Sequence, residues 1–367
     1  MYMRLRDILI QAMYALLLLV TLTSCAYETK EEAAIRLGNK TNPANTQGQS
    51  TNVSAGKLTS VQFYVPSMID NRIDVIDVPT SQVVGQIALE GSPTVVIFSS
   101  TKRDAYVSQQ DQSSIAIINT QTLQVEHEVE VGPLPHGLAI TPDNQTLYVA
   151  TVDDQFIYTI DIQAAKEGKQ IRADATIDLG QGAKTNYLVL RNNRLYVSDH
   201  VNHKVYVIDT KTHKVTQTIS TGKIPRAIYV NPTGTRLFVP CAGDHVLEVY
   251  NAQTGEQLHS IATANGPTDI IVNEDGSRAW VTALEGNAVS VIDLIGNQII
   301  TSITALPGAK HIAFNRLETK AYVTLSSSNK VAVIDTSTNQ MIETIDVGEM
   351  PHGIQIKALP GIGGSCG

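Results

Sequence analysis

The sequence predicts an all-β protein, a seven-bladed β-propeller in which each blade is a four-stranded antiparallel sheet. The main observation is an aromatic-Val pair that recurs seven times. The pairs begin at Tyr64, Tyr106, Tyr148, Tyr196, Phe238, Trp280 and Tyr322, in steps of 42, 42, 48, 42, 42 and 42 residues. Each pair is followed by an alternating run that ends in Asp or Asn, such as IDVID or VYVID. A repeat of this length, built from short period-2 segments and turns, is typical of a propeller blade.

Within one unit the four strands follow in a fixed order. The first follows a glycine, as in Leu138–Ile140; the second holds the aromatic-Val pair, the third ends in Asp or Asn, and the fourth ends at the next glycine. The long step has a visible cause, because residues 164–174 enlarge one hairpin loop of the third unit. The Asp or Asn that ends the third strand indicates hairpin turn chemistry, since it recurs in every unit.

The two ends of the repeat region complete each other. Unit 1 begins directly at Phe63-Tyr64 and lacks a first strand, whereas PHGIQI at Pro351–Ile356 is a first strand with no unit behind it. We therefore expect the C-terminal strand to join the N-terminal blade and close the ring.

The N-terminal residues indicate an export signal. Arg4 and Arg6 precede an apolar stretch that ends in Leu22-Thr23-Ser24-Cys25, which resembles the lipobox of bacterial lipoproteins. The expected organisation is a lipoprotein signal peptide at 1–24, lipidated Cys25 with a polar flexible tether to residue 57, the propeller at 58–358 and a flexible tail at 359–367. The alternative is an ordinary secretory signal with a chance cysteine.

The segments YVSQQ, YVATV, YVSDH and YVTLS, together with VIDT and the GxxPxG-type turns, resemble the YVTN-repeat β-propellers. These are secreted or surface proteins whose fold is that of the methylamine dehydrogenase heavy chain. The resemblance covers about residues 61–357 and implies the propeller fold. It does not select a function, because propellers serve as scaffolds, lyases, lactonases and cofactor enzymes.

Composition excludes some functions. The 367-residue chain has a formal net charge of −8, which argues against sequence-independent nucleic-acid binding. The sequence has no CxxCH, HExxH, Walker or GxSxG motif, and no Ser-His-Asp set can be identified. We therefore name no catalytic residue and favour a protein that is not an enzyme.

The loop that enters each innermost strand places one residue per blade at the mouth of the central channel. Counting back from the aromatic-Val pairs, these mouth residues are His352, Thr94, His136, Asn186, Arg226, Thr268 and Lys310. The set has no acidic member and is rich in hydrogen-bond donors, so it suits an anionic or carbonyl-bearing ligand.

The same face carries further metal-ligand residue types. Imidazole and thiolate suit zinc or copper, and the candidates are His136, His352, His200, His245 and Cys241. His311 lies beside Lys310 on this face, whereas His127, His259 and His213 fall on outer strands or the opposite face. The alternative for His136 and His352 is a structural role in a Pro-His-Gly turn, and for Cys241 a small buried side chain.

These observations lead to one leading hypothesis and two alternatives. The leading one is a monomeric, lipid-anchored propeller of the cell envelope that acts as a binding or scaffold protein through its mouth face, toward an envelope protein or a small anionic or carbonyl ligand. The anchor places it on the periplasmic side or outer membrane of a Gram-negative cell, or on the outer face of a Gram-positive one. The alternatives are a zinc- or copper-binding, metallocofactor-handling protein and a lactonase- or lyase-type enzyme. Cys366 is expected to be a free tail thiol or to pair with another protein.

Overall fold

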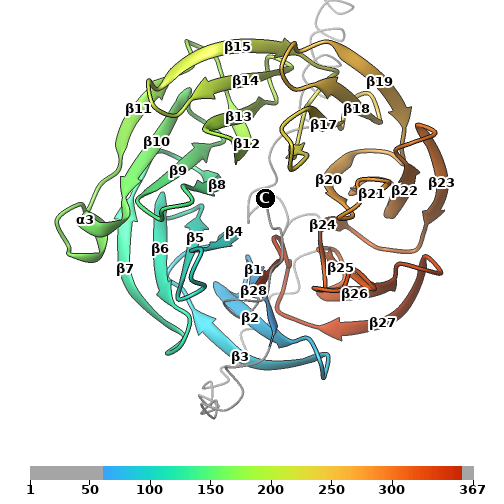
Figure 1. The fold of residues 1–367 in the computed structure, drawn as a ribbon. Coiled ribbons are helices and arrows are strands. Elements are labelled where there is room, and N and C mark those ends of the chain that lie inside the picture. Colours follow the sequence, from blue (N-terminus) through green and yellow to red (C-terminus); the bar gives the residue numbers. More distant parts are fainter. Residues whose placement is uncertain (1–60, 358–367) are drawn as a thin grey trace, which may run out of the picture. The chain divides into compact units, whose positions relative to one another are not determined.

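A computed structural model describes residues 61–357 of the chain. In it the strands form seven four-stranded antiparallel sheets around a central axis (Figure 1). The predicted seven-bladed propeller is confirmed. Residues 1–60 and 358–367, which include Cys25, the expected tether and Cys366, lie outside the described residues.

The first four blades contain the following strands, ordered from the channel outward. Blade 1 consists of β28 (Gln355–Lys357), β1 (Gln62–Ser67), β2 (Arg72–Asp77) and β3 (Gln82–Ala88). Blade 2 consists of β4 (Pro93–Phe98), β5 (Asp104–Gln109), β6 (Ser114–Asn119) and β7 (Gln124–Glu130). Blade 3 consists of β8 (Pro135–Ile140), β9 (Thr146–Thr151), β10 (Phe156–Asp161) and β11 (Asp174–Asp178). Blade 4 consists of β12 (Thr185–Arg191), β13 (Arg194–Asp199), β14 (Lys204–Asp209) and β15 (Lys214–Ser220).

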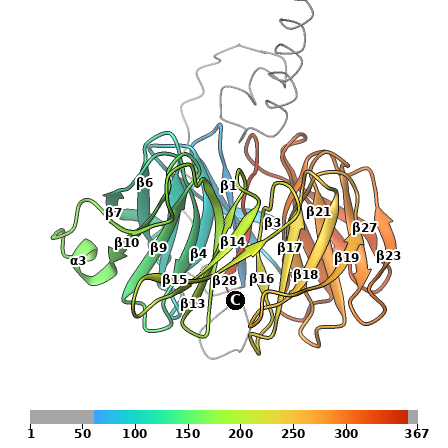
Figure 2. The ribbon, with the colours of Figure 1, turned by 90° about the horizontal axis from the view of Figure 1, so that it is seen from above.

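The remaining three blades follow the same order. Blade 5 consists of β16 (Tyr229–Val230), β17 (Arg236–Cys241), β18 (Val246–Asn251) and β19 (Gln257–Ala262). Blade 6 consists of β20 (Pro267–Val272), β21 (Arg278–Ala283), β22 (Ala288–Asp293) and β23 (Gln298–Ile303). Blade 7 consists of β24 (Ala309–Phe314), β25 (Lys320–Leu325), β26 (Lys330–Asp335) and β27 (Gln340–Asp346). Seen from the side, the strands run from one face of the ring to the other (Figure 2).

The repeated Asp or Asn at the end of the third strand organises a hairpin turn, as predicted. In blade 4 the Asp209 side chain accepts hydrogen bonds from the backbone N–H groups of Lys211 at 3.0 Å and Thr212 at 2.8 Å. The turn then passes through His213, which has a φ of 54°. A short carboxylate or amide that satisfies two backbone donors lets the chain reverse within a few residues.

The C-terminal strand closes the ring. β28 pairs antiparallel with β1, with Tyr64 opposite Gln355, and Ser67 forms an isolated bridge with Pro351. The backbone N–H of Gly348 donates to Asp74 of β2 at 2.8 Å. The two ends of the repeat region therefore share blade 1, as the incomplete first unit predicted.

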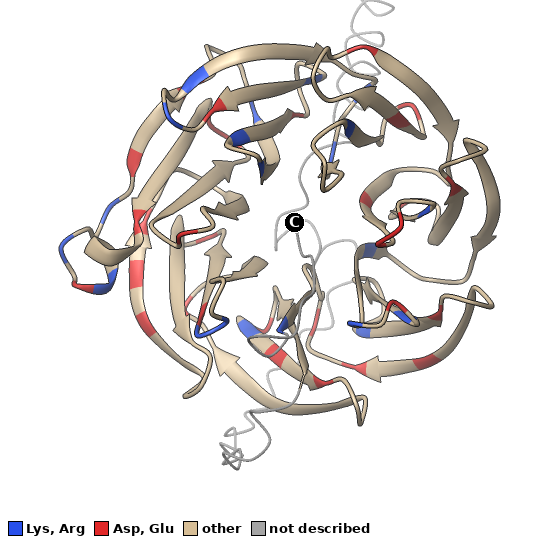
Figure 3. Cartoon of the chain, in the orientation of Figure 1, with Lys and Arg blue, Asp and Glu red and all other residues tan. Residues whose placement is uncertain are grey.

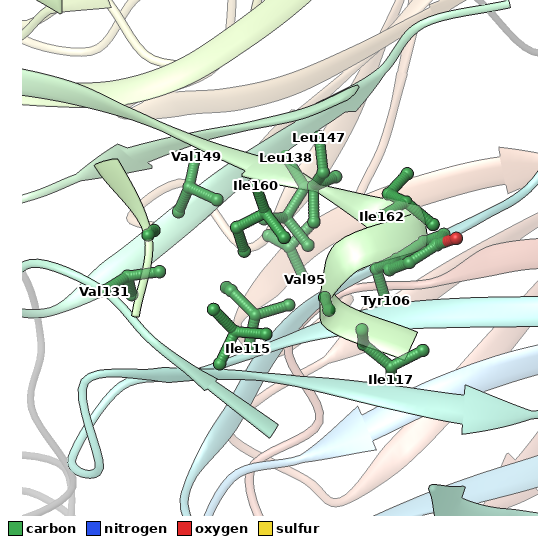
Figure 4. Close-up of a cluster of buried hydrophobic side chains, with 13 residues drawn as sticks. Val95, Tyr106, Ile115, Ile117, Val131, Leu138, Leu147, Val149, Ile160 and Ile162 are labelled. Carbon is green, nitrogen blue, oxygen red and sulfur yellow. The ribbon is translucent and has the colours of Figure 1, made fainter. Parts of the chain in front are cut away.

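Seven clusters of buried apolar side chains hold the ring together, and each lies between two neighbouring blades. Figure 4 shows the cluster between blades 2 and 3, where Ile115 lies opposite Val149 and Ile160 and Ile117 belongs to the same cluster. The cluster between blades 7 and 1 includes Ile356 of the closing strand. Because a blade buries its faces only against its neighbours, each interface depends on an intact ring.

The enlarged loop of blade 3 contains a short helix, α3 (Ile162–Lys166). The side chain of Asp161 accepts from the backbone N–H of Ala164 at 2.9 Å and caps the helix, while Ile162 packs into the cluster of Figure 4. Acidic residues recur along the outermost strand β7 (Figure 3). Within residues 61–357, no helix has the length and apolarity needed to cross a membrane.

Candidate metal centre

The mouth residues lie where the innermost strand loses its regular pairing. The register between the first two strands shifts between Pro135 and Leu138 in blade 3, and between Ala309 and Ile312 in blade 7. Blades 2, 4 and 6 show the same irregularity. An extra residue at such a bulge changes the direction of a side chain, so two consecutive residues per blade can contribute to the mouth.

Hydroxyl side chains from the second strands hold these bulges in place. Thr324 accepts from the backbone N–H of His311 at 3.0 Å and donates to the carbonyl oxygen of His352 in blade 1 at 2.7 Å. Ser108 and Thr282 bond in the same way to the carbonyls of His136, at 3.1 Å, and Lys310, at 2.7 Å. The Ser or Thr that follows the aromatic-Val pair thus ties the three mouth residues His136, Lys310 and His352 to the preceding blade.

Removing this hydroxyl is expected to destabilise the fold. Thr324→Val keeps the side-chain shape but leaves a buried carbonyl and a buried N–H without their partner, which costs about 1–3 kcal/mol. Urea unfolding measures the loss, and Thr344→Val on the exposed outer strand β27 is the matched control. Equal unfolding midpoints for the two variants would contradict the role of the hydroxyl.

Three buried histidines from blades 1, 3 and 7 meet at the channel mouth. His136, His311 and His352 each offer one ring nitrogen, and these nitrogens all lie within 4.8 Å of one another. The ring centroids are 5.2 Å apart for His136 and His352 and 4.8 Å for His311 and His352. Blades 3 and 7 are not neighbours, so their side chains approach each other only across the central axis.

The second nitrogen of two of these histidines is fixed by an outer partner. Nδ1 of His136 lies 3.0 Å from the carbonyl oxygen of Asn186, and because a carbonyl only accepts, Nδ1 carries the proton. Nδ1 of His311 lies 3.0 Å from a carboxylate oxygen of Asp269 and 3.2 Å from the Tyr187 hydroxyl. In the neutral form of each ring, Nε2 is then the nitrogen that has a lone pair for a ligand. Histidines that bind metals commonly donate their other N–H to a carboxylate or a backbone carbonyl in this way.

The surroundings keep two of the rings neutral. Burial lowers the pKa of His136 well below its ordinary value, and His311 lowers it further. Burial, followed by the nearby Lys310, does the same for the pKa of His352. A neutral imidazole is the form that binds a metal ion.

The lowered pKa values predict that the metal-free protein loses stability in acid. In the unfolded chain these histidines titrate near 6.5, so below that pH the unfolded state binds more protons than the folded state. Stability is therefore fully present above about pH 6.5 and decreases as the pH falls, by up to about 1.4 kcal/mol per pH unit for each histidine. Thermal unfolding from pH 7.5 to 5 checks this, and a His136→Asn/His352→Asn double variant should show a shallower slope. An unchanged slope in that variant would contradict the assignment.

The other mouth residues surround the histidines in different roles. The carbonyl oxygen of Thr94 accepts from the N–H of Gly353 at 2.9 Å, and the Thr268 hydroxyl donates to the carbonyl of Gly266 at 3.1 Å. The positive charges of Lys310 and Arg226 both act on His136. Lys310 is buried and Arg226 is partly exposed.

Three of the five residues suggested as metal ligands lie outside the histidine cluster. Cys241 donates from Sγ to Glu248 at 3.3 Å, and burial together with Glu248 raises the pKa of its thiol. Nδ1 of His245 accepts from the backbone N–H of Gly266 at 3.0 Å. Burial and Arg226 lower the pKa of His200 to about 4. Two of the five predicted ligands, His136 and His352, do lie in the cluster. Within the described part of the chain, the third potential ligand of that group is His311.

The sequence did not identify Asp269 and Tyr187 as residues of the site. It assigned His311 to the mouth face but not to the set of proposed metal ligands. All three occupy the position directly after a mouth residue, which is glycine in the blades of His136 and His352. A Cβ atom at Gly137 would lie 2.8 Å from the Asn186 carbonyl oxygen, so that blade has no room for a side chain there. Comparing the residue that directly follows the mouth residue in each of the seven units could have identified these three residues.

Comparisons with known proteins agree with the fold. Residues 180–359 match the family model described as YNCE-like beta-propeller. Antigen Lp49 of Leptospira interrogans is 27% identical over 180 residues, which are 47% of this chain and 38% of that protein. YncE of Salmonella typhimurium, itself described as uncharacterized, is 29% identical over 76 residues, 21% of each chain. The chain therefore aligns with well under half the length of these relatives.

Solved structures show the same fold at low identity. A functionally unknown protein from Desulfotomaculum acetoxidans has a TM-score of 0.69 and 19% identity, covering 80% of this chain and 98% of its own. Hydrazine synthase of Kuenenia stuttgartiensis has a TM-score of 0.63 and 18% identity, covering 71% and 88% of the two chains. Dihydro-heme d1 dehydrogenase NirN, in complex with DHE, has a TM-score of 0.63 and 15% identity, covering 86% and 77%. At these identities the likeness extends to the fold alone.

Proposed function

Because this chain is a YVTN-type β-propeller whose mouth brings three blades together on one axis, we propose that it is a metal-binding protein with a three-histidine centre. The ligands are Nε2 of His136 and of His311 and a ring nitrogen of His352. The observation that carries the proposal is the convergence of three buried imidazoles within 4.8 Å, two of them oriented by outer partners.

The chemistry of the cluster selects the kind of metal. Three imidazoles without a thiolate suit zinc or copper(II), at about 2.0–2.1 Å per bond for zinc. Tetrahedral coordination at that bond length places the nitrogens roughly 3.3 Å apart, so the cluster needs only a small inward movement of its side chains. Three protein ligands leave a fourth position for a small molecule, which is typical of zinc sites that bind or process a ligand.

The geometry favours the metal-binding hypothesis over a scaffold that uses a flat mouth surface. The histidines are at most 3% exposed, so they offer little surface to a protein partner. Buried, mutually close imidazoles suit a small bound species better than a protein partner.

Metal analysis of the full chain, purified without a histidine tag, tests the proposal. We expect one equivalent of zinc or copper after dialysis against trace metal, and a higher melting temperature than that of chelator-treated protein. Absence of both metals, together with a melting temperature that neither metal changes, would overturn the proposal.

We also propose that the protein works at the cell envelope, anchored through a lipid on Cys25. The support is the sequence Leu22-Thr23-Ser24-Cys25 after an apolar segment. Cys25→Ala is expected to move the protein from the membrane fraction to the soluble or unprocessed fraction, whereas the same change at Cys241 leaves it in the membrane fraction. Immunoblotting of fractionated cells measures this, and an unchanged distribution of the Cys25 variant would contradict the anchor.

A further inference from the structure

The loop that leads from β19 to β20 contains Asn265-Gly266, the single Asn-Gly pair in the 367-residue sequence. The Asn265 side chain is exposed and makes no hydrogen bond to any residue in the described range 61–357. Gly266 has a φ of 65° and no Cβ, so no side chain of its own stands between its backbone nitrogen and the Asn265 amide. The loop therefore places an electrophilic amide carbon next to a nitrogen that can attack it.

A base contacts the N–H of that nitrogen. The backbone N–H of Gly266 donates to Nδ1 of His245 at 3.0 Å, which is within the reach of a general base for the proton that it removes. Because Nδ1 accepts, the neutral imidazole carries its own proton on Nε2. The hydrogen bond lies in the plane of the peptide, whereas the electrons that attack lie above and below that plane. His245 therefore removes the proton without blocking the approach of the Asn265 side chain.

The fold holds the backbone of this pair and leaves the Asn265 side chain free to turn. The Asn265 carbonyl accepts from the N–H of Gly286 at 2.8 Å, and the Gly266 carbonyl accepts from the N–H of Leu284 at 3.0 Å. Both donors belong to blade 6, whereas His245 belongs to blade 5, so the loop is fixed between two blades. A nitrogen that is held beside a base favours an intramolecular reaction, because little orientational freedom remains to be lost.

The same bond recurs in neighbouring blades, which separates its structural role from its chemical one. Four side chains at 42-residue steps each accept the backbone N–H of the residue 21 positions further on. These acceptors are His203, His245, Asn287 and Asn329. Asparagine holds such a loop although an amide is not a base. Among the four donors, Gly266 alone follows an asparagine, since positions 223, 307 and 349 hold Lys, Pro and Glu.

We propose that Asn265 is a site of self-modification, at which His245 acts as the general base for deamidation through a cyclic imide. The Gly266 nitrogen loses its proton to Nδ1 of His245 and bonds to Cγ of Asn265, and the bond from Cγ to the side-chain nitrogen breaks. His245 returns the proton to that leaving nitrogen, which departs as ammonia. Water then opens the imide at either carbonyl and leaves aspartate or isoaspartate at position 265.

The modification places a new carboxylate in the loop that leads to the channel mouth. Position 265 precedes the mouth residue Thr268 by three residues and Asp269, the partner of His311, by four. The reaction uses groups of this loop, of His245 and of water, and no metal takes part in it. The inference therefore stands or fails separately from the proposed metal-binding function.

The test is the rate of deamidation at Asn265 in the folded full chain, followed by mass spectrometry of proteolytic peptides. A synthetic peptide of residues 260–272, which contains no histidine, gives the rate without the fold. We expect the folded chain to react about tenfold or more faster than the peptide, because a positioned general base contributes about 10²–10⁴-fold to a rate. A rate in the folded chain at or below that of the peptide overturns the inference, since it shows that the loop protects the pair.

His245→Asn separates the base from the structural acceptor. Asparagine accepts the equivalent N–H in two other blades, so this variant keeps the loop bonded and removes the base. We expect it to slow deamidation of the folded chain about tenfold or more, with little change in melting temperature. His203→Asn is the matched control, because it makes the same exchange one blade earlier and leaves the rate at Asn265 unchanged. An equal rate in the His245 variant and the parent chain would show that this histidine is a structural acceptor only.

Discussion

His311→Ala is expected to lower zinc affinity by more than about a hundredfold. Loss of an outer partner of a metal-binding histidine already costs about 10–100-fold in affinity, and loss of the ligand itself exceeds that. The variant also leaves the Asp269 carboxylate without the imidazole that it orients. Isothermal titration with zinc, or competition with a coloured chelator, measures the change.

The control for this experiment is His259→Ala. His259 lies on the outermost strand β19 and is exposed, so its removal changes the histidine count without touching the mouth. A His311 variant that binds zinc as tightly as the His259 variant would show that the cluster is a structural packing of imidazoles.

A chain that ends at Asp346 is expected to lose its cooperative unfolding or to melt at least about 10 °C lower. It lacks β28 and therefore the pairing with β1, together with Ile354 and Ile356 from the cluster between blades 7 and 1. Each lost isoleucine costs about 2–5 kcal/mol in a core, and 1 kcal/mol corresponds to about 2–4 °C for a domain of 150–250 residues. Scanning calorimetry measures the transition.

Point variants separate ring closure from loss of chain length. Ile356→Ala, at a side chain that is 6% exposed, should destabilise by about 2–5 kcal/mol. Ile342→Ala on β27, at a side chain that is 52% exposed, should change stability by less than about 0.5 kcal/mol. Equal stabilities would mean that the closing strand contributes little to the ring.

The architecture could be predicted because each blade repeats the same local chemistry. The amino-acid sequence itself shows the aromatic-Val pairs, the Asp or Asn turns and the missing first strand. Together these features determine the number of blades, the order of strands and the closure of the ring. The helix in the enlarged loop of blade 3 could not be predicted from the sequence, because Ile162–Lys166 is too short to show a periodic pattern and depends on packing against blade 2.

The candidate site was only partly predictable. The repeat identified His136 and His352 as equivalent mouth residues, but spacing alone could not show that they meet. Asp269 and Tyr187 come from other blades and from the next position in the repeat, and the bulge decides that they reach His311. Cys241 and His245 share the face of the mouth by sequence, yet local partners in their own and the next blade hold them.

The seven-bladed ring, its closure by the C-terminal strand and the set of residues that can reach the mouth are all readable from the amino-acid sequence, because they follow from a period of 42 residues and one missing strand. Which mouth residues form a centre depends on the folded ring. Closing a ring brings blades 1, 3 and 7 to one axis although their histidines are separated by up to 216 positions, from 136 to 352. The sequence pattern does not show that the three histidines meet, because their approach depends on the geometry of the bulges and on the burial of each imidazole ring.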